Sequence, residues 1–265
     1  MSMLCVGLDP DPALLPPGVG LDDFLRGVVE ATADLVCCFK PQIAFYEALG
    51  LPGLVSLRTL FRVLSETGVP VLLDAKRGDV ASTTVAYARA AFDDLGADAI
   101  TVNPYLGGDS LKPFFDYPDR GVFVLCKTSN PGAGEMQDLL VDGSSEPLFV
   151  RVARHATTWD QHGTLGLVVG ATYPGDVARV RAVAPSAPIL LPGVGAQAGD
   201  LEASVAAALD ATGGGLLVTA SRSILYASRG SDWAAAARAE AVRLRDAINA
   251  ARASAGAVPS ATPGR

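Results

Sequence analysis

The feature that most constrains the fold is an alternation of short apolar segments with longer helical patterns along the chain. Eight segments rich in β-branched and other apolar residues predict strands. The segment Val69–Asp74 is almost continuously apolar, which is typical of parallel strands buried on both faces. The eight predicted strands are Leu4–Asp9, Leu35–Pro41, Pro70–Lys76, Ala99–Pro104, Val122–Thr128, Leu165–Thr172, Ile189–Gly193 and Leu216–Ser221.

Helical patterns, with apolar residues three and four apart, lie between these strands. Two of them end at Gly68 and Gly96, which are helix stop signals. Eight strand–helix units in 265 residues predict an α/β protein, a (β/α)8 TIM barrel in one domain. An open doubly wound sheet is the alternative, but no Gly-x-Gly-x-x-Gly follows the first strand. The predicted helices are Asp22–Asp34, Leu54–Thr67, Ala81–Leu95, Pro147–Trp159, Ala178–Val183, Asp200–Ala211 and Trp233–Ala253.

Three segments depart from this alternation of predicted strands and helices. Residues 1–253 are expected to form the barrel, and the Ala/Ser/Pro/Gly-rich residues 254–265 a disordered tail. Tyr105–Arg120 and Asn130–Glu146 are long, polar and rich in Gly and Asp. Each follows a predicted strand, so each is a candidate lid over the catalytic face.

Composition narrows the class of function. The chain is 49% hydrophobic and only 18% charged, which indicates a large core. A net charge of −7 argues against general affinity for nucleic acid or an anionic membrane. No apolar run is long enough to span a membrane, and the first residues do not resemble a signal peptide, so a cytoplasmic location is expected. The four cysteines and two histidines lack metal-ligand spacing and predict no metal site.

Ionisable and polar residues gather where the predicted strands end. In a barrel the chemistry lies at these carboxyl ends, whereas the rest of each strand here is almost free of charge. Scattered polar caps would explain one or two such positions, but not nearly every strand. The residues concerned are Asp9, Lys40, Asp74, Lys76, Asn103, Lys127, Ser129, Ser221 and Arg222.

The densest segment is Asp74-Ala75-Lys76-Arg77-Gly78-Asp79. Strand alternation predicts that Asp74 and Lys76 share the inner face, with Leu72 deeper on the same face. At about 4 Å and an effective dielectric of about 20, each unlike charge pair gains about 4 kcal/mol. Such an array keeps its lysine protonated and its aspartates ionised. A purely stabilising ion-pair network is the alternative, although buried charges are costly.

A second signal follows the seventh and eighth strands. Pro192-Gly193-Val194-Gly195-Ala196-Gln197 is a glycine-rich turn whose backbone N–H groups could face an anion. Arg222 follows the eighth strand and could clamp the same anion. Because the loops after strands seven and eight form the usual phosphate site of barrels, the sequence predicts phosphate binding here.

Together these motifs resemble the orotidine 5′-phosphate decarboxylase family, in its longer, bacterial-type branch. Asp74–Asp79 matches the family's Asp-x-Lys-x-x-Asp motif, and the resemblance covers nearly the whole chain, to about Ala227. The other matching segments, in order and spacing, are Leu8-Asp9, Phe39-Lys40-Pro41, Asn103–Leu111, Thr128–Gly132, Pro192–Gln197 and Ser221-Arg222-Ser223.

The resemblance implies decarboxylation of orotidine 5′-monophosphate to uridine 5′-monophosphate and CO2, without a cofactor. The family's catalytic Lys-Asp-Lys-Asp array maps to Lys40, Asp74, Lys76 and Asp79. It implies that Lys76 protonates C6 of the pyrimidine as CO2 leaves and that Asp74 lies against the substrate carboxylate. It also implies a homodimer in which Asp79 and Thr83 reach the partner's site.

The same resemblance implies the substrate contacts. Asp9 and Lys40 would hold ribose hydroxyls, and Ser129 would contact the pyrimidine edge. Gln197 and Arg222 would hold the 5′-phosphate, with Gln197 also bridging to a closed lid. Pro192, Gly193 and Ser221 lie beside them, and Ser221 stands where many relatives have glycine.

Two other functions compete with this interpretation. Sister enzymes that act on keto-sugar phosphates use the same motif with Mg²⁺ and a further acidic ligand near the end of strand two. Here that end reads Phe39-Lys40-Pro41-Gln42, with a lysine and no acid. A nucleotide-binding sensor without activity is the non-enzyme alternative, but every charged member of the catalytic array is present.

Overall fold

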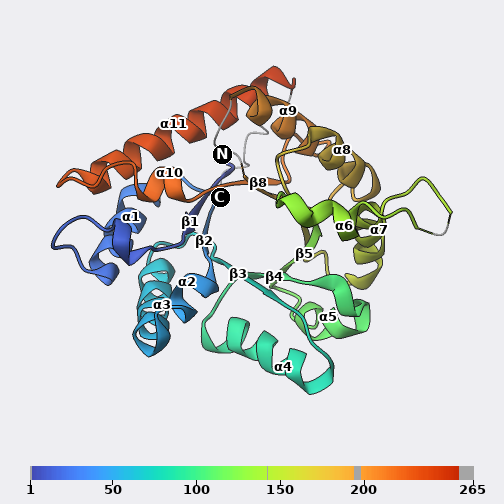
Figure 1. The fold of residues 1–265 in the computed structure, drawn as a ribbon, viewed down its shortest axis with the longest axis horizontal. Coiled ribbons are helices and arrows are strands. Elements are labelled where there is room, and N and C mark those ends of the chain that lie inside the picture. The colour runs from blue at the N-terminus through green and yellow to red at the C-terminus, as the bar shows by residue number, and fades with distance from the viewer. Residues whose placement is uncertain (1, 142, 194–197, 257–265) are drawn as a thin grey trace, which may run out of the picture.

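The chain forms a ring of parallel strands with helices around it (Figure 1). The computed structural model describes residues 2–141, 143–193 and 198–256. The strand order is β2-β1-β8-β7-β6-β5-β4-β3, and all seven strand pairings are parallel. Isolated parallel bridges, Phe39 with Val71 and Gln42 with Asp74, join the two ends of this order. The predicted TIM barrel is therefore confirmed over the open sheet.

All eight predicted strands are present, each within about three residues of its predicted bounds. They are β1 (Leu4–Leu8), β2 (Cys38–Pro41), β3 (Leu72–Arg77), β4 (Ala99–Val102), β5 (Gly121–Lys127), β6 (Leu165–Val169), β7 (Ile189–Pro192) and β8 (Leu216–Ala220).

The longer helices cover the outside of the barrel, and α11 packs against α1 and α9. Gly68 and Gly96 have φ values of 68° and 76°, as expected of glycines that stop helices. The helices are α1 (Leu21–Thr32), α2 (Ile43–Glu47), α3 (Gly50–Ser65), α4 (Ala81–Arg89), α5 (Gly108–Phe115), α6 (Gly134–Gln137), α7 (Leu148–Trp159), α8 (Pro174–Val183), α9 (Ala198–Ala208), α10 (Arg222–Leu225) and α11 (Trp233–Ser254).

Strand alternation divides the buried residues into two layers. The larger layer lies between strands and helices and contains Leu73 and Ala75. The smaller contains Leu72, together with inward-facing residues of the other strands. Leu72 and Leu73 therefore face opposite sides of β3, as the alternation predicted. The smaller layer comprises Cys5, Cys38, Leu72, Ala99, Phe123, Val168 and Leu190.

The segment Tyr105–Arg120 is not the long polar lid that its composition suggested. It contains α5, the barrel helix between β4 and β5. Leu111 and Phe114 are fully buried on one face of this helix, and that apolar stripe outweighs the surrounding glycines and aspartates. Asn130–Glu146 is the longer connection of the two, and its described residues form the short α6 and one 3-10 turn, Pro131–Ala133.

Helix α11 ends at Ser254, one residue beyond the predicted barrel boundary, and residues 257–265 of the predicted tail lie outside the described residues. All four cysteines are free thiols, three of them buried and Cys37 half-buried. Within the described residues, no helix is both long and apolar enough to cross a membrane.

Candidate active site

Three of the predicted catalytic side chains meet at the carboxyl ends of β2 and β3. Asp74 lies between two lysines: its Oδ2 is 3.2 Å from Lys40 Nζ, and its Oδ1 is 2.6 Å from Lys76 Nζ. The side chains of Lys40 and Asp74 are 6% and 11% exposed, whereas that of Lys76 is 43% exposed. Lys40 and Asp74 thus form the buried base of the site, and the ammonium group of Lys76 faces its open side.

The backbone of β3 leaves regular strand geometry to make this arrangement. The β3–β4 register shifts between Leu73 and Arg77, and Lys76 has a φ of 48°. A residue other than glycine in the left-handed region stores about 1–3 kcal/mol of strain, which the surrounding structure must offset. Bulges of this kind commonly redirect a side chain beside an active site.

Thr101 on β4 holds the irregular part of β3 in place. Its Oγ1 accepts hydrogen bonds from the backbone N–H groups of Ala75 and Lys76, each at 3.0 Å. The same hydroxyl donates to Asp74 Oδ1 at 2.8 Å. Thr101 is 1% exposed, so water does not compete for these bonds. One side chain therefore fixes both the bulge and the carboxylate.

The charges of the network stabilise one another. Burial alone would raise the pKa of Asp74, but the charges of Lys40 and Lys76 and the hydrogen bonds outweigh it and hold that pKa below its ordinary value. Burial alone would lower the pKa of Lys40, but the charges of Asp9 and Asp74 outweigh it and raise that pKa. At neutral pH the network therefore contains a carboxylate next to a buried ammonium group.

Asp9 follows β1 beside this network. Its Oδ1 accepts a hydrogen bond of 3.2 Å from the backbone N–H of Gln42, which ties the end of β1 to the residue after β2. Ser221, after β8, packs over Gly7, where any Cβ would overlap Ser221 Oγ and lie 3.2 Å from Asp9 Oδ2. Gly7 is thus required so that Ser221 and Asp9 can lie together at the mouth.

The predicted phosphate-binding residues lie after β7 and β8. Pro192 ends β7, and Gly193 follows with a φ of 92°, a conformation that favours glycine. A Cβ on Gly193 would lie 3.8 Å from Ser129 Oγ, so the loops after β5 and β7 are neighbours. Arg222 begins α10 and is exposed. Gln197 lies outside the described residues.

Asp79 and Thr83 are not part of the network formed within one chain. Asp79 Oδ1 accepts a hydrogen bond of 2.8 Å from the N–H of Val80, and among the described residues Asp79 has no ion pair. Thr83 is exposed on α4. Thr84, its neighbour, is buried and donates to the Asp79 carbonyl oxygen at 2.5 Å, which fixes the turn between β3 and α4.

The sequence reasoning missed Thr101 and left the role of Lys127 open. Thr101 could have been found, because it is the one polar residue within the strand Ala99-Ile100-Thr101-Val102. Lys127 is buried and pairs with Asp138. Asn103, in contrast, accepts a hydrogen bond from the Tyr105 N–H and caps a short turn. His155 and His162 are exposed, as expected of surface residues.

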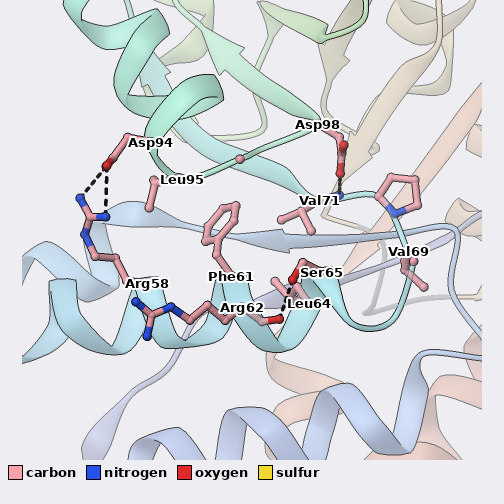
Figure 2. Close-up of a pocket in the computed structure, with 13 residues that line it drawn as sticks. Arg58, Phe61, Arg62, Leu64, Ser65, Val69, Val71, Asp94, Leu95 and Asp98 are labelled. Carbon is pink, nitrogen blue, oxygen red and sulfur yellow. Dashed lines mark hydrogen bonds and ion pairs between the residues drawn. The ribbon is translucent and has the colours of Figure 1, made fainter.

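A separate surface hollow lies at the opposite end of the barrel (Figure 2). It lies between the end of α3 and the segments that enter β3 and β4. Arg58 forms a two-point contact with Asp94 at its rim, and Phe61 lies within it. None of the predicted catalytic residues lines it.

Within the described ranges, no cluster of three or more His, Cys, Asp or Glu residues could hold a metal ion.

Comparisons with known proteins give one consistent result. The model of the orotidine 5′-phosphate decarboxylase / HUMPS family matches residues 2–239. The orotidine 5′-phosphate decarboxylase of Thermomicrobium roseum is 54% identical over 257 residues, covering 95% of this chain and 91% of that protein. The protein of the same name from an Azoarcus species is 53% identical over 257 residues, covering 95% of this chain and 94% of that protein.

A solved structure agrees in both fold and sequence. The Leishmania donovani OMP decarboxylase matches with a TM-score of 0.82 and 43% identity, over 95% of this chain and 94% of that one. The family match, the identity of the curated relatives and this structural likeness all extend over nearly the full length. The chain belongs to the orotidine 5′-phosphate decarboxylase / HUMPS family.

Proposed function

We propose that this chain converts orotidine 5′-monophosphate into uridine 5′-monophosphate and CO2 in pyrimidine biosynthesis. Relatives that bear the name orotidine 5′-phosphate decarboxylase are identical to this chain at more than half of the aligned residues, over nearly its full length. The observation that carries the assignment is the Lys40–Asp74–Lys76 network at the carboxyl ends of β2 and β3. Its charges suit a reaction in which an anion loses CO2 and the remaining carbon gains a proton.

Lys76 supplies the proton in this proposal. The bond between C6 and the carboxylate breaks, its electron pair stays on C6, and CO2 leaves. A proton from Lys76 Nζ then forms the C6–H bond, and the neutral amine takes a new proton from water. A fixed ammonium group stabilises negative charge where it develops, which is the largest contribution in many enzymes. The exposed position of Lys76, held by Asp74, supports this role.

Asp74 has two roles in the proposal. It orients Lys76, whose Nζ lies 2.6 Å from Asp74 Oδ1 in an ion pair. It also lies where the substrate carboxylate would bind, so that loss of CO2 relieves repulsion between two negative groups. Binding energy from the remote phosphate would offset that repulsion in the bound substrate.

The other substrate contacts follow from the positions of the strand ends. Asp9, which follows β1, and Lys40, which lies near the end of β2, hold ribose hydroxyls. Ser129, after β5, contacts the pyrimidine edge. The phosphate lies beyond β7 and β8, where an exposed arginine and backbone N–H groups suit an anion. The proposed phosphate-site residues are Pro192, Gly193, Gln197, Ser221 and Arg222.

A homodimer forms part of this proposal, with Asp79 and Thr83 reaching the partner's site. Exposed apolar side chains lie on the connections after β2, β3 and β4, and Asp79 and Thr83 belong to the second of these connections. Burial of these apolar side chains against a second copy would remove a large apolar surface from water. Replacing Tyr105 by Asp should separate the subunits. The control Leu140→Asp, which changes an exposed residue after β5, should leave the dimer intact. Sedimentation velocity measures the oligomeric state of both variants. The side chains are Leu51, Leu54, Val55, Val80, Val85, Tyr105 and Leu106, which are 40–78% exposed.

The position of Lys40 argues against a keto-sugar phosphate enzyme of the same family. Those enzymes resemble this chain but carry an additional acidic metal ligand near the end of the second strand. Here Lys40 occupies that strand end, with its Nζ 3.2 Å from Asp74. A cation placed there would be repelled by a buried ammonium group.

The direct test is an absorbance assay with orotidine 5′-monophosphate in the presence and absence of excess EDTA. We expect complete conversion to uridine 5′-monophosphate at the same rate in both. A chain that leaves the substrate unchanged in both conditions is not this enzyme. Loss of activity with EDTA alone would refute the cofactor-free reaction while keeping the substrate.

A further inference from the structure

Lysine is scarce in this chain, and its positions are informative. The sequence contains four lysines, at 40, 76, 112 and 127, against 17 arginines. Lys112 lies on the exposed side of α5, where it pairs with Asp116 one turn later. The other three lie in barrel strands near their carboxyl ends. Lys40 and Lys76 belong to the catalytic network, which leaves Lys127 as a third strand-end lysine without an assigned role.

Lys127 is turned away from the barrel mouth by a second irregularity. Phe123 and Leu125 face the inner layer, so simple alternation would place Lys127 there as well. The β5–β6 register instead shifts between Leu125 and Lys127. Lys127 Nζ lies 5.4 Å from the ring centroid of Phe149, which belongs to the layer between strands and helices. The bulge thus buries the lysine beneath α7 rather than exposing it to substrate.

The charge of Lys127 is directed to one carboxylate. Its side chain is 4% exposed and forms an ion pair with Asp138, which is 50% exposed. Asp176 and Arg179, both on α8, are charged groups among the described residues that also face this pair. A buried ammonium group costs several kcal/mol in desolvation, and a hydrophobic residue in its place is often as stable. Stability alone therefore does not account for a lysine here.

The pair closes a short loop that includes Ser129 near its start. Lys127 and Asp138 enclose residues 128–137, which include Ser129. Within this loop, Thr128 N–H donates to Gln137 Oε1 at 2.9 Å, and Gln137 Nε2 donates to Thr128 Oγ1 at 2.8 Å. The two ends of the loop are thus held together by the Lys127–Asp138 ion pair and, one residue further in, by the hydrogen bonds between Thr128 and Gln137. Ser129 Oγ then lies close to Gly193 of the proposed phosphate loop.

We propose that Lys127 is a positioning residue for base recognition: through Asp138 it holds residues 128–137 so that Ser129 meets the pyrimidine edge. This inference rests on the proposed function, because it takes Ser129 as the contact to the base. Lys127 itself touches no substrate in this arrangement. Its effect falls mainly on the base contact, since the residues proposed to hold the ribose and the phosphate come from other strands.

Two ligands that differ only in the base make the test selective. Uridine 5′-monophosphate and ribose 5-phosphate share the sugar phosphate, and only the first carries a pyrimidine. Dissociation constants for both are measured by calorimetry on the full chain and on Lys127→Met. We expect about a tenfold weaker affinity for uridine 5′-monophosphate and a change within about twofold for ribose 5-phosphate. Lys112→Met, which removes the exposed lysine of α5, should change neither.

The outcomes separate this inference from the proposed function. If Lys127→Met weakens the binding of both ligands equally, the substitution has caused a general structural defect, and the positioning role is overturned. Unchanged affinity for uridine 5′-monophosphate would overturn the role as well. A wild-type chain that neither turns over orotidine 5′-monophosphate nor binds uridine 5′-monophosphate would instead overturn the function itself. If Lys127→Met fails to fold, Asp138→Ala should show the same selective loss, and Asp138→Glu should restore affinity for uridine 5′-monophosphate. Equal loss of both ligands in Asp138→Ala, or no loss, would again overturn the role.

Discussion

Thr101 Oγ1 on β4 donates a hydrogen bond of 2.8 Å to Asp74 Oδ1 on β3 and accepts from the backbone N–H groups of Ala75 and Lys76, within the β3 bulge. The carboxylate between the two lysines is therefore fixed by a neutral side chain from the next strand. Because Lys76 carries a φ of 48°, its conformation depends on these bonds. The position of the proposed acid is thus determined by a residue that touches no substrate.

Replacing Thr101 by Val should lower both stability and turnover. Valine keeps the shape of the side chain but leaves two buried N–H groups without a partner, which costs about 2 kcal/mol or more. Turnover should fall at least about tenfold because Lys76 is no longer held in place. Urea unfolding and a kcat measurement check the two effects. Thr101→Ser keeps the hydroxyl and should retain most of both; equal losses in the two variants would contradict the role of the hydroxyl.

The charge of Asp74 should contribute to stability in a pH-dependent way. Its pKa in the folded chain lies below the unfolded value of about 3.9, despite burial, because of Lys40 and Lys76. The contribution is therefore present above that value and is lost as the pH falls through the folded pKa. The difference in free energy of unfolding between the wild type and Asp74→Asn should be largest at neutral pH and shrink below about pH 4. Chemical unfolding from pH 7 to pH 3 measures this difference, and a constant value would contradict the account.

Arg222 should act on the phosphate alone. Its guanidinium is exposed at the start of α10, where a charge-assisted pair with phosphate is worth about 2–3 kcal/mol. Arg222→Ala should weaken the binding of uridine 5′-monophosphate by about 30- to 100-fold and leave the affinity for uridine almost unchanged. Calorimetry with both ligands measures this. Arg243→Ala on the exposed side of α11 serves as the matched control. Equal weakening of the two ligands would place Arg222 away from the phosphate.

Active sites shared between subunits should show complementation. In the proposed homodimer, Lys76→Ala and Asp79→Ala should each abolish activity, but a mixed dimer would hold one site that carries both changes and one that carries neither. Mixing the two proteins under exchange conditions should restore about a quarter of wild-type activity, since half of the dimers are mixed and each has one intact site. No recovery, with subunit exchange demonstrated by differently tagged chains, would place Asp79 in its own subunit's site.

The strand-end residues could be predicted because they depend on regular geometry. All eight strands follow from apolar runs, and a barrel brings their carboxyl ends together, so Lys40 and Asp74 were expected to lie close. Leu72 and Leu73 face opposite layers, as alternation requires. Local pattern alone was sufficient for these features, because each depends only on strand period and strand order.

The two bulges could not be predicted from that pattern. A bulge depends on pairing between strands, and no local signal in Ala75-Lys76 or Cys126-Lys127 specifies the shift in register. The first keeps Lys76 beside Asp74, with the help of Thr101, and the second turns Lys127 away from the mouth. Helix α5 was missed for the opposite reason, because glycine and aspartate content concealed an apolar stripe that only packing against the barrel makes decisive.

The central claim is that Lys76 donates the proton to C6, and the Lys76→Ala variant tests it most directly. The measurement pairs kcat for orotidine 5′-monophosphate with the dissociation constant for uridine 5′-monophosphate. We expect kcat to fall at least about a thousandfold, because both the acid and the fixed positive charge are lost, while the product still binds through its ribose and phosphate. A Lys76→Ala enzyme that turns over at a rate near the wild type would contradict the account.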